Sequence, residues 1–335
     1  MKVHAISSRS DPRGNSRSSG GGSIVTDQVV PPPERAPAID VVICTHNRPD
    51  LLRVAVDAVL AQDYAGKVTV VVVFDRSEPD LSLERHDPAR RVLVVTNTRT
   101  GGLAGARNSG VLAGGSPLVA FCDDDDAWEP DKLTRQVRRL LYTGALTCVT
   151  GIRIQYGDHS SVRLARADEM TLERLVRRRV MPAHPSSVLV RREALLGPIG
   201  LVDEHIPGSY AEDYDWILRA ALAGDICVVE EPLVRVMWGQ SLFSGRWRTI
   251  IEALDYMVDK FPQFQADRGA LARIRGQQAF GHAALGERRR SLGKVWETMR
   301  LNPAEPRAWV ALPVAVGLVK ADTVMGALHR RGHGI

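Results

Sequence analysis

The sequence predicts an α/β protein whose mostly parallel sheet is flanked by helices and followed by a helical C-terminal extension. β-Branched runs alternate with helical patterns between residues 39 and 122, which is typical of βαβ units. Residues 68–74 form an almost unbroken apolar run, as expected for a central parallel strand that is covered on both faces. From about residue 246 onward, every segment has a helical pattern.

The first half of the sheet begins with a strand at residues 39–44 and continues with a helix at residues 49–62. The helix is expected because apolar residues recur there at helical spacing. These apolar residues are Leu51, Leu52, Val56, Val59 and Leu60. The other elements of this half are strands at 68–74, 92–95 and 118–122, and a small-residue helix at 103–113.

The second half has short strands separated by irregular loops, and we expect it to complete the same sheet. An amphipathic helix is expected at residues 132–142. The remaining elements are strands at 146–155, 186–190 and 226–230, a short helix at 191–196 and a longer helix at 211–223.

Composition divides the chain into three parts. Residues 1–37 are rich in Ser, Gly, Arg and Pro, which predicts a disordered leader. Residues 38–245 form the α/β domain, and residues 246–335 form the helical C-terminal region. We expect breaks between its helices at Pro262, Gly286, Pro303 and Pro313.

The charge pattern limits the kinds of partner. The 335 residues carry a formal charge of +5, which suits an anionic substrate or an anionic membrane surface. No aromatic residues interleave with the basic ones to form a platform for nucleic acid, and the arginines at 174–179 are interpreted as an exposed helix face. Apolar and basic residues interleave at 273–295, as on a helix that lies on a membrane surface or one that packs on its own domain.

The cysteines and the apolar segments predict the cellular location of the protein. The four cysteines (Cys44, Cys122, Cys148 and Cys227) are far apart and show no zinc-site or redox spacing, so we expect buried free thiols. No signal peptide is apparent, and the apolar stretch at 308–319 is too short to span a bilayer. These features predict a cytoplasmic protein, with peripheral membrane contact through the C-terminal helices as a further expectation.

Polar clusters follow three of the expected strands. They are residues 45–48, residues 75–77 and the four consecutive aspartates Asp123 to Asp126. Ligands of open α/β sheets bind beyond the carboxyl ends of the strands, so we expect the three clusters to share one site. Carboxylate oxygens suit a hard divalent ion such as Mg²⁺ or Mn²⁺. The alternative for the aspartates is a solvated acidic turn.

Five motifs, in order, resemble those of glycosyltransferase family 2, whose members have the GT-A fold with a Rossmann-like sheet. The resemblance covers roughly residues 39–245. Cys44 stands where the family usually has a proline, and Phe74 stands in place of the first acid of the second motif. The motifs are Val41-Val42-Ile43-Cys44-Thr45-His46-Asn47-Arg48, Val71-Val72-Val73-Phe74-Asp75-Arg76-Ser77, residues 101–110 around Arg107-Asn108, the aspartates with Trp128, and Ala211-Glu212-Asp213-Tyr214-Asp215-Trp216.

The resemblance implies a metal-dependent inverting glycosyltransferase that moves one sugar from a nucleotide-diphosphate sugar to an acceptor hydroxyl. It divides the domain into a nucleotide-binding half (38–128) and an acceptor-binding half (129–245). The acceptor is a glycan, a lipid-linked saccharide or a small molecule, and the cofactor is Mg²⁺ or Mn²⁺. Asp213 is implied as the general base, with Asp215 as the weaker alternative.

The resemblance also assigns the binding residues. Asp125 and Asp123 are implied as metal ligands, while Glu212 and His184 would bind the acceptor. The donor-binding residues are Thr45, Asn47, Arg48, Asp75, Arg107, Asp123 and Asp124.

Several of these residues have alternative roles. Asn47 would also cap the helix that opens at Pro49, and Arg107 would also pair with the acidic cluster. His184 is as well explained as an ordinary loop residue. Asp126 is expected either to support the metal ligands or to cap the helix after it.

The chain departs from the family pattern in two places. The family often has a histidine after the last sheet strand, but residues 235–239 read Arg-Val-Met-Trp-Gly. The signature of processive synthases is not met, because Gln240 and Arg246-Trp247 have the wrong spacing. This favours transfer of a single sugar.

Two other classes of protein fit the sequence less well. A nucleotidyltransferase would normally have a glycine-rich loop with a basic residue after the first strand, whereas the turn here is Thr-His-Asn-Arg. A non-catalytic nucleotide-sugar or carbohydrate-binding relative would not need the acids at Asp123, Asp125, Glu212 and Asp213.

Overall fold

The computed structural model describes residues 36–157, 159–237 and 245–329. Residues 1–35 of the expected leader lie outside the described residues, as do Trp238, Gly239 and Gln240. Part of the segment in which the family often has a histidine therefore lies outside the described residues.

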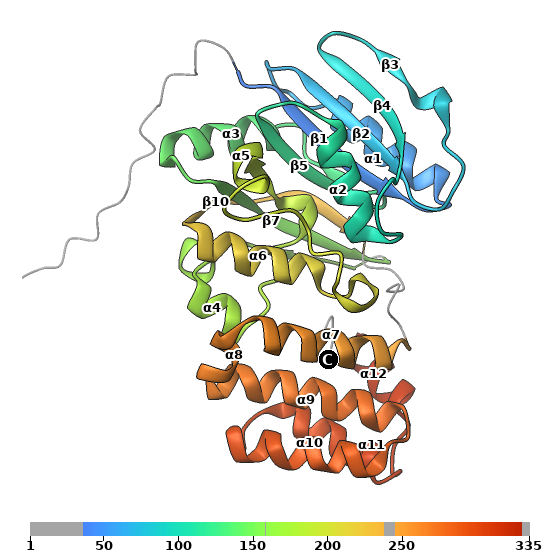
Figure 1. The fold of residues 1–335 in the computed structure, drawn as a ribbon, viewed down its shortest axis with the longest axis vertical. Coiled ribbons are helices and arrows are strands. Elements are labelled where there is room, and N and C mark those ends of the chain that lie inside the picture. Colours follow the sequence, from blue (N-terminus) through green and yellow to red (C-terminus); the bar gives the residue numbers. More distant parts are fainter. Residues whose placement is uncertain (1–35, 158, 238–244, 330–335) are drawn as a thin grey trace, which may run out of the picture. The chain divides into compact units, whose positions relative to one another are not determined.

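The described residues form one ten-stranded sheet in the order β3-β4-β2-β1-β5-β9-β7-β10-β6, with β8 beside β7 (Figure 1). Four strands pair in parallel as a central block: β1 (Ile39–Thr45), β2 (Val68–Phe74), β4 (Arg90–Thr96) and β5 (Leu118–Asp123). The others are β3 (Arg85–His86), β6 (Ala127–Trp128), β7 (Thr147–Tyr156), β8 (His159–Arg163), β9 (Leu189–Arg191) and β10 (Ile226–Met237). The predicted fold class is confirmed.

The strand order of the parallel block reverses between β1 and β5. From β1 the chain builds outward through β2 and β4 on one side, then returns to place β5 on the other side of β1. Such a reversal leaves a crevice at the carboxyl ends of the two strands. Cys44 pairs in register with Asp123, so the turn after β1 lies directly beside the four aspartates.

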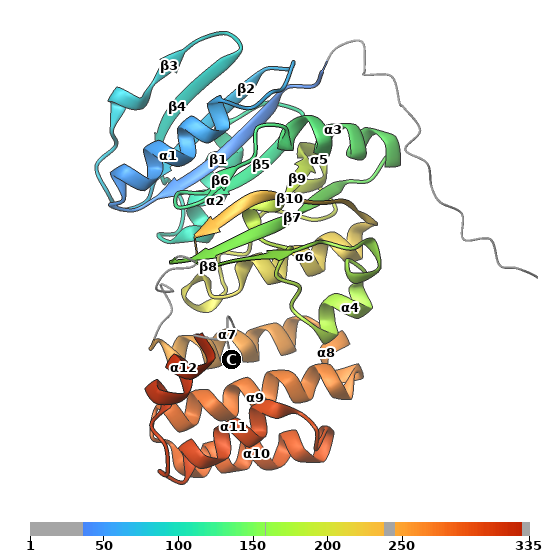
Figure 2. The same ribbon diagram turned by 180° about the vertical axis from the view of Figure 1, so that it is seen from behind.

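Helices cover both faces of the sheet. α1 (Pro49–Leu60) and α3 (Lys132–Thr143) pack on one face (Figure 2), and α2 (Leu103–Ala113) and α6 (Glu212–Ala223) pack on the other. Successive side chains of a strand point to opposite faces of the sheet. In β2, Val71 and Val73 belong to one core cluster, and Val70 and Val72 belong to the other. This explains the unbroken apolar run.

Some predicted boundaries were wrong for local reasons. β10 runs on past the expected end at residue 230, because irregular pairing with β7 on both sides of Pro232 lets the strand accommodate the proline. Only the end of the strand expected at 186–190 is extended, as β9, and it follows a single 3-10 turn, η3 (Pro185–Ser187). The short helix expected at 191–196 is confirmed as α5 (Arg192–Leu195), and the expected helix face at 174–179 begins in α4 (Leu172–Arg177).

The C-terminal region is helical, as predicted. Its helices are α7 (Trp247–Lys260), α8 (Pro262–Ala266), α9 (Arg268–Ala284), α10 (Arg288–Leu301), α11 (Pro306–Ala315) and α12 (Ala321–His329). The expected break at Pro313 was wrong, since this proline lies inside α11. It stands in the last turn of the helix, where it costs a single hydrogen bond to the carbonyl of Trp309.

The C-terminal helices share their core with the α/β domain. Leu254 and Met257 of α7 and Ile274 of α9 belong to the same buried cluster as Leu175 and Ile217 of the α/β domain. A separate cluster joins α9, α10 and α11. Among the described residues, no helix is both long enough and apolar enough to cross a bilayer. All four cysteines are buried and free, as predicted.

Candidate active site

The turn after β1 holds the middle of the aspartate run. Thr45 donates from Oγ1 to Asp124 Oδ2 at 2.8 Å. Arg48 Nη1 donates to Asp124 Oδ1 at 3.2 Å and to Asp125 Oδ2 at 2.8 Å. Thr45 and Arg48 therefore meet Asp124 and Asp125, and the arginine offsets part of the repulsion between the two carboxylates.

Asn47 lies in the same turn with an exposed side chain and a backbone φ of 56°. The expectation that it caps α1 was wrong, because the N-cap residue is Arg48 and no side chain caps the helix. The left-handed φ is one that asparagine adopts more readily than most residues. Asn47 thus shapes the turn that carries Thr45 and Arg48.

The carboxylate of Asp75, at the end of β2, is held by three donors. Asn97 Nδ2 donates to Oδ1 at 2.7 Å, the Gly102 amide donates to Oδ1 at 3.1 Å, and Arg76 Nε donates to Oδ2 at 3.0 Å. Burial raises the pKa of Asp75, but these hydrogen bonds and the charge of Arg76 outweigh it, so the pKa lies below its usual range. The group is therefore an ionised acceptor.

A buried ion-pair chain links the end of β5 to the start of α6. Arg107 on α2 donates from Nη2 to Asp123 Oδ1 at 2.7 Å and from Nη1 to Glu212 Oε1. Arg107 and Glu212 are buried, and Asp123 is half-buried. We call this chain the Asp123–Arg107–Glu212 link. The expected pairing of Arg107 with the acidic cluster is confirmed, and the arginine joins that cluster to the first turn of α6.

Asp213, the predicted base, is next to this link on α6. Arg179 Nη2 donates to its Oδ1 at 2.9 Å and to its Oδ2 at 2.6 Å. The interpretation of residues 174–179 as one exposed helix face was wrong for Arg179, because α4 ends at Arg177 and the chain then turns toward α6. The alternative base, Asp215, is fully buried between Lys260 and Arg219, which keeps it from a substrate.

The two neighbouring acids of α6 differ in their pKa values. Burial raises the pKa of Glu212 to about 7 despite the opposing charge of Arg107. Burial also acts on Asp213, but the charge and hydrogen bonds of Arg179 lower its pKa below the usual range. Separated pKa values in adjacent carboxyls are typical of acid–base sites.

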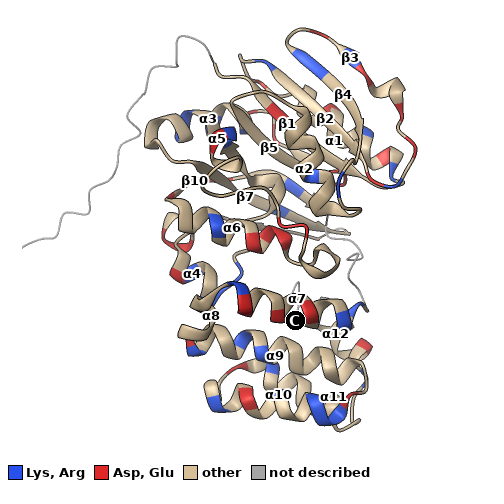
Figure 3. Ribbon diagram, viewed as in Figure 1, with Lys and Arg blue, Asp and Glu red and all other residues tan. Residues whose placement is uncertain are grey.

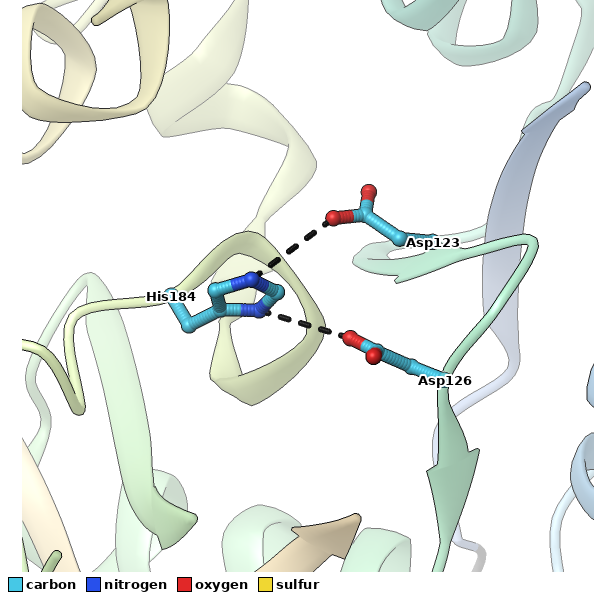
Figure 4. A group of neighbouring side chains, drawn as sticks. All are labelled: Asp123, Asp126 and His184. Carbon is cyan, nitrogen blue, oxygen red and sulfur yellow. Dashed lines mark ion pairs between the residues drawn. The ribbon is translucent and has the colours of Figure 1, made fainter. Parts of the chain in front are cut away.

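His184 and Asp126 form a third group with Asp123 (Figure 4). His184 Nε2 lies 3.8 Å from Asp123 Oδ2, and its Nδ1 lies 3.5 Å from Asp126 Oδ2. Ser186 donates from Oγ to Asp126 Oδ2 at 2.5 Å and accepts from the Asp123 amide at 3.0 Å. The expectation that Asp126 caps a helix was wrong, since β6 follows it and Asp131 stands at the N-cap of α3.

This third group fits a divalent ion. Two carboxylates and an imidazole offer ligand atoms within 4.8 Å of one another. Burial raises the pKa of Asp126 to about 7, although the charge of His184 and the hydrogen bond from Ser186 oppose the shift. The two carboxylates suit hard ions such as Mn²⁺, and the imidazole is a ligand that first-row transition metals accept. Asp125, which the family resemblance assigns to the metal, lies instead against Arg48.

Three residues of the site were missed from the sequence. Asn97 directly follows β4 at the carboxyl end of a parallel strand, so the rule that selected Asp75 would have found it. Ser186 and Arg179 gave no comparable signal. Their contacts with Asp126 and Asp213 span 60 and 34 residues of chain.

An open, mostly parallel sheet with charged side chains gathered at its switch point defines the class of α/β proteins that bind ligands beyond the carboxyl ends of their strands. Residues 40–196 match the family model described as glycosyl transferase family 2. These residues, slightly less than half of the chain, are therefore similar to glycosyl transferase family 2.

The chain is similar in sequence to two bacterial proteins. It is 30% identical over 216 residues to the succinoglycan biosynthesis protein ExoO of Rhizobium meliloti, a match that covers 59% of each chain. It is 27% identical over 103 residues to the UDP-Glc:alpha-D-GlcNAc-diphosphoundecaprenol beta-1,3-glucosyltransferase WfgD of Escherichia coli, covering 31% of this chain and 41% of WfgD. The chain thus spans less than two thirds of the length of these relatives.

Solved structures share the fold. S. aureus TarS 1–349 in complex with UDP-GlcNAc has a TM-score of 0.60 at 17% identity, covering 88% of this chain and 92% of that one. The mannosyltransferase PcManGT from Pyrobaculum calidifontis, in complex with GDP-Man and Mn²⁺, has a TM-score of 0.54 at 17% identity, covering 88% and 85%. At this level of identity the likeness is one of fold alone.

Proposed function

We propose that the protein is a metal-dependent, inverting glycosyltransferase that moves one sugar from a nucleotide-diphosphate sugar to an acceptor hydroxyl. The observation that carries the proposal is the Asp123–Arg107–Glu212 link. It brings the end of β5, where a donor diphosphate would lie, next to the start of α6, where Asp213 would meet an acceptor. Donor and acceptor groups would therefore meet across one arginine.

In this proposal the donor lies over the turns after β1, β2 and β5. Asp75 accepts from the nucleotide base, and its ionised carboxylate is fixed by Asn97 and Gly102. Thr45, Asn47, Arg48 and Asp124 line the nucleoside pocket. Arg107 contributes positive charge near the diphosphate, where the leaving group gains negative charge.

Asp123, Asp126 and His184 would hold the divalent ion. When bound, the ion supplies Lewis-acid stabilisation of the departing diphosphate. Support comes from the distances within this group and from the Mn²⁺ that accompanies GDP-Man in the PcManGT complex. The competing assignment, in which Asp125 is a ligand, makes a different prediction for metal affinity, given in the Discussion.

Asp213 would act as the general base. As the acceptor oxygen forms its bond to the anomeric carbon, the hydroxyl proton passes to a carboxylate oxygen of Asp213, and the bonding electrons of the sugar–phosphate bond leave with the diphosphate. Each carboxylate oxygen has two lone pairs, so Asp213 can accept this proton while it holds Arg179. Glu212 would bind acceptor hydroxyls beside it, whereas His184, first expected at the acceptor, is assigned here to the ion.

We further propose a lipid-linked saccharide as the acceptor. The name of WfgD specifies a diphosphoundecaprenol-linked GlcNAc acceptor for that protein, and the basic charge of this chain suits an anionic diphosphate.

A thermal-shift screen tests the proposal. UDP-glucose, UDP-GlcNAc and GDP-mannose are each added with and without Mn²⁺. We expect one donor to raise Tm only in the presence of Mn²⁺, because a ligand at 100 times its Kd adds about 2.7 kcal/mol of stability. That donor should then yield free nucleoside diphosphate when a lipid-linked acceptor is present. A protein that binds a donor but never releases nucleoside diphosphate would be a non-catalytic binder.

A further inference from the structure

The outward face of α10 carries exposed apolar and basic side chains. Arg289, Leu292, Trp296 and Arg300 follow one another at intervals of three or four residues, so they lie in line on one side of the helix. We call these four residues the α10 stripe. Leu292 is 40% exposed and Trp296 is 59% exposed, and both arginines are exposed.

The opposite face of α10 is the packed one. Ser291, Val295 and Thr298 are buried, and Ser291 donates to the carbonyl of Ala279 on α9 at 2.8 Å. α10 and α11 lie on the side of α9 away from α7 (Figures 1 and 2). The orientation of α10 is therefore fixed by its core contacts, and the stripe is left facing outward.

The structure reassigns the membrane-surface pattern predicted at residues 273–295. The α9 part of that pattern is packed: Arg273 is buried and donates to the hydroxyl of Tyr214 at 2.9 Å. Only the α10 part reaches the surface. Of the five described tryptophans, the two that are more than half exposed, Trp296 and Trp309, lie on α10 and α11.

We propose that the α10 stripe is a docking surface for a membrane that contains anionic lipids. Leu292 and Trp296 would enter the headgroup region, where an indole ring is well accommodated. Arg289 and Arg300 flank them at the two ends, and the stripe contains no carboxylate. Basic residues stand at both ends of α10 (Figure 3), so its charge complements an anionic surface.

The local geometry supports a shallow contact. The guanidinium of Arg300 lies 4.5 Å from the centre of the Trp296 ring, which presents the ring and a charge together. Gly293, between the apolar residues, has open space around it. Two apolar side chains make too small a patch for a stable protein interface, which buries about 800 Å² on each partner. A lipid surface needs no such area.

Vesicle co-sedimentation tests this proposal without any donor or acceptor, so its failure is separate from failure of the proposed function. The full chain is mixed with vesicles of phosphatidylcholine alone, or of phosphatidylcholine with phosphatidylglycerol, whose negative charge stands in for an anionic leaflet. We expect binding to the anionic vesicles that weakens with salt. Trp296→Ala should lower the partition coefficient about tenfold, and Arg289→Gln with Arg300→Gln about fivefold for each arginine.

Matched controls come from α3 and β4. Tyr142→Ala removes an exposed aromatic residue from α3, and Arg91→Gln with Arg138→Gln removes two exposed charges. These variants should bind as the wild type does. The proposal is overturned if the wild type ignores anionic vesicles or if the stripe variants bind them equally well. It is also overturned if the wild type is a dimer that Trp296→Ala converts to a monomer, because the stripe would then join two copies of the chain.

Discussion

Arg179 donates from a single nitrogen, Nη2, to both carboxylate oxygens of Asp213, at 2.9 and 2.6 Å. The ion pair connects the segment after α4 to the first turn of α6. Because the pair also lowers the pKa of Asp213, it would keep the proposed base ionised and in one orientation. Arg179 is in this sense a positioning residue for Asp213.

Replacing Arg179 should shift the pH dependence of activity. Asp213 must be ionised to accept a proton. Without Arg179 its pKa rises, so the acidic limb of the kcat profile should move to higher pH and kcat at neutral pH should fall about tenfold or more. The measurement is kcat against pH for Arg179→Met, with Arg178→Met, an exposed neighbour, as the control. An unchanged acidic limb in Arg179→Met would rule out this role.

Metal affinity should separate the two assignments of the aspartates. Loss of a ligand weakens metal binding by at least about tenfold. We therefore expect Asp126→Asn and His184→Gln to weaken Mn²⁺ binding, measured by electron paramagnetic resonance of the free ion. Asp125→Asn, whose carboxylate is paired with Arg48, should retain most of the affinity. The reverse pattern would support Asp125 as the ligand and refute the Asp123–Asp126–His184 site.

The part of this site that could be predicted from the sequence is the part whose residues stand at the ends of predicted strands. Contacts between residues that are far apart in the sequence could not be predicted. Thr45 and Asp123 are the last residues of β1 and β5, and Asp75 directly follows β2. Prediction of these strands was therefore enough to place the three residues at one edge of the sheet. The contacts of Arg179 and His184 come from loops whose course depends on where short helices such as α4 and η3 end. No local sequence pattern predicts the residues at which these short helices end, because tertiary packing determines them.

The fold was predictable for a related reason. The runs at β2 and α2 had the predicted bounds, since a buried strand and a small-residue helix leave clear periodic signals. β10 and α11 did not, because Pro232 and Pro313 are tolerated by a bulge and by a helix end. A proline removes a backbone hydrogen bond from a strand or helix, and the surrounding contacts decide whether the strand or helix ends there.

The C-terminal helices should affect activity through Lys260. This lysine of α7 lies 2.6 Å from Asp215 Oδ1 on α6 and pairs with Asp203 as well. Asp215 follows Asp213 by two residues, so Lys260→Met should disturb the helix that carries the proposed base. We expect a loss of stability of about 2 kcal/mol and a fall in kcat with little change in donor affinity.

Two variants control this experiment. Lys260→Arg should restore most of the activity, and Lys294→Met, which breaks an ion pair with Glu297 within α10, should leave kcat unchanged. Urea unfolding gives the stability, and initial rates give the KM-against-kcat split. Full activity in Lys260→Met would show that α7 does not position α6.

Buried Lys132 predicts a pH-dependent stability term. It is 0% exposed, its Nζ lies 3.7 Å from the centre of the Trp128 ring and donates to Gln136 Oε1 at 2.7 Å, and burial lowers its pKa to about 7. Its pKa in the unfolded chain is about 10.4. Between these values the unfolded state holds the proton more tightly, so raising the pH favours the folded state.

Comparison with Lys132→Met isolates this term. The free energy of unfolding of the wild type minus that of the variant should increase as the pH rises from 7 to 10, measured by urea unfolding at each pH. Arg138→Gln, an exposed change on the same helix, should show no such trend. A pH-independent difference for Lys132→Met would mean that Lys132 stays charged in the folded protein.

The most direct test of the central proposal compares sugar transfer with donor binding in Asp213→Asn. The donor identified by the thermal-shift screen is supplied with Mn²⁺ and a lipid-linked acceptor, and release of nucleoside diphosphate is measured beside donor affinity. We predict that the variant binds donor as the wild type does but releases nucleoside diphosphate at least about a hundredfold more slowly. Release at the wild-type rate would contradict the assignment of Asp213 as the base.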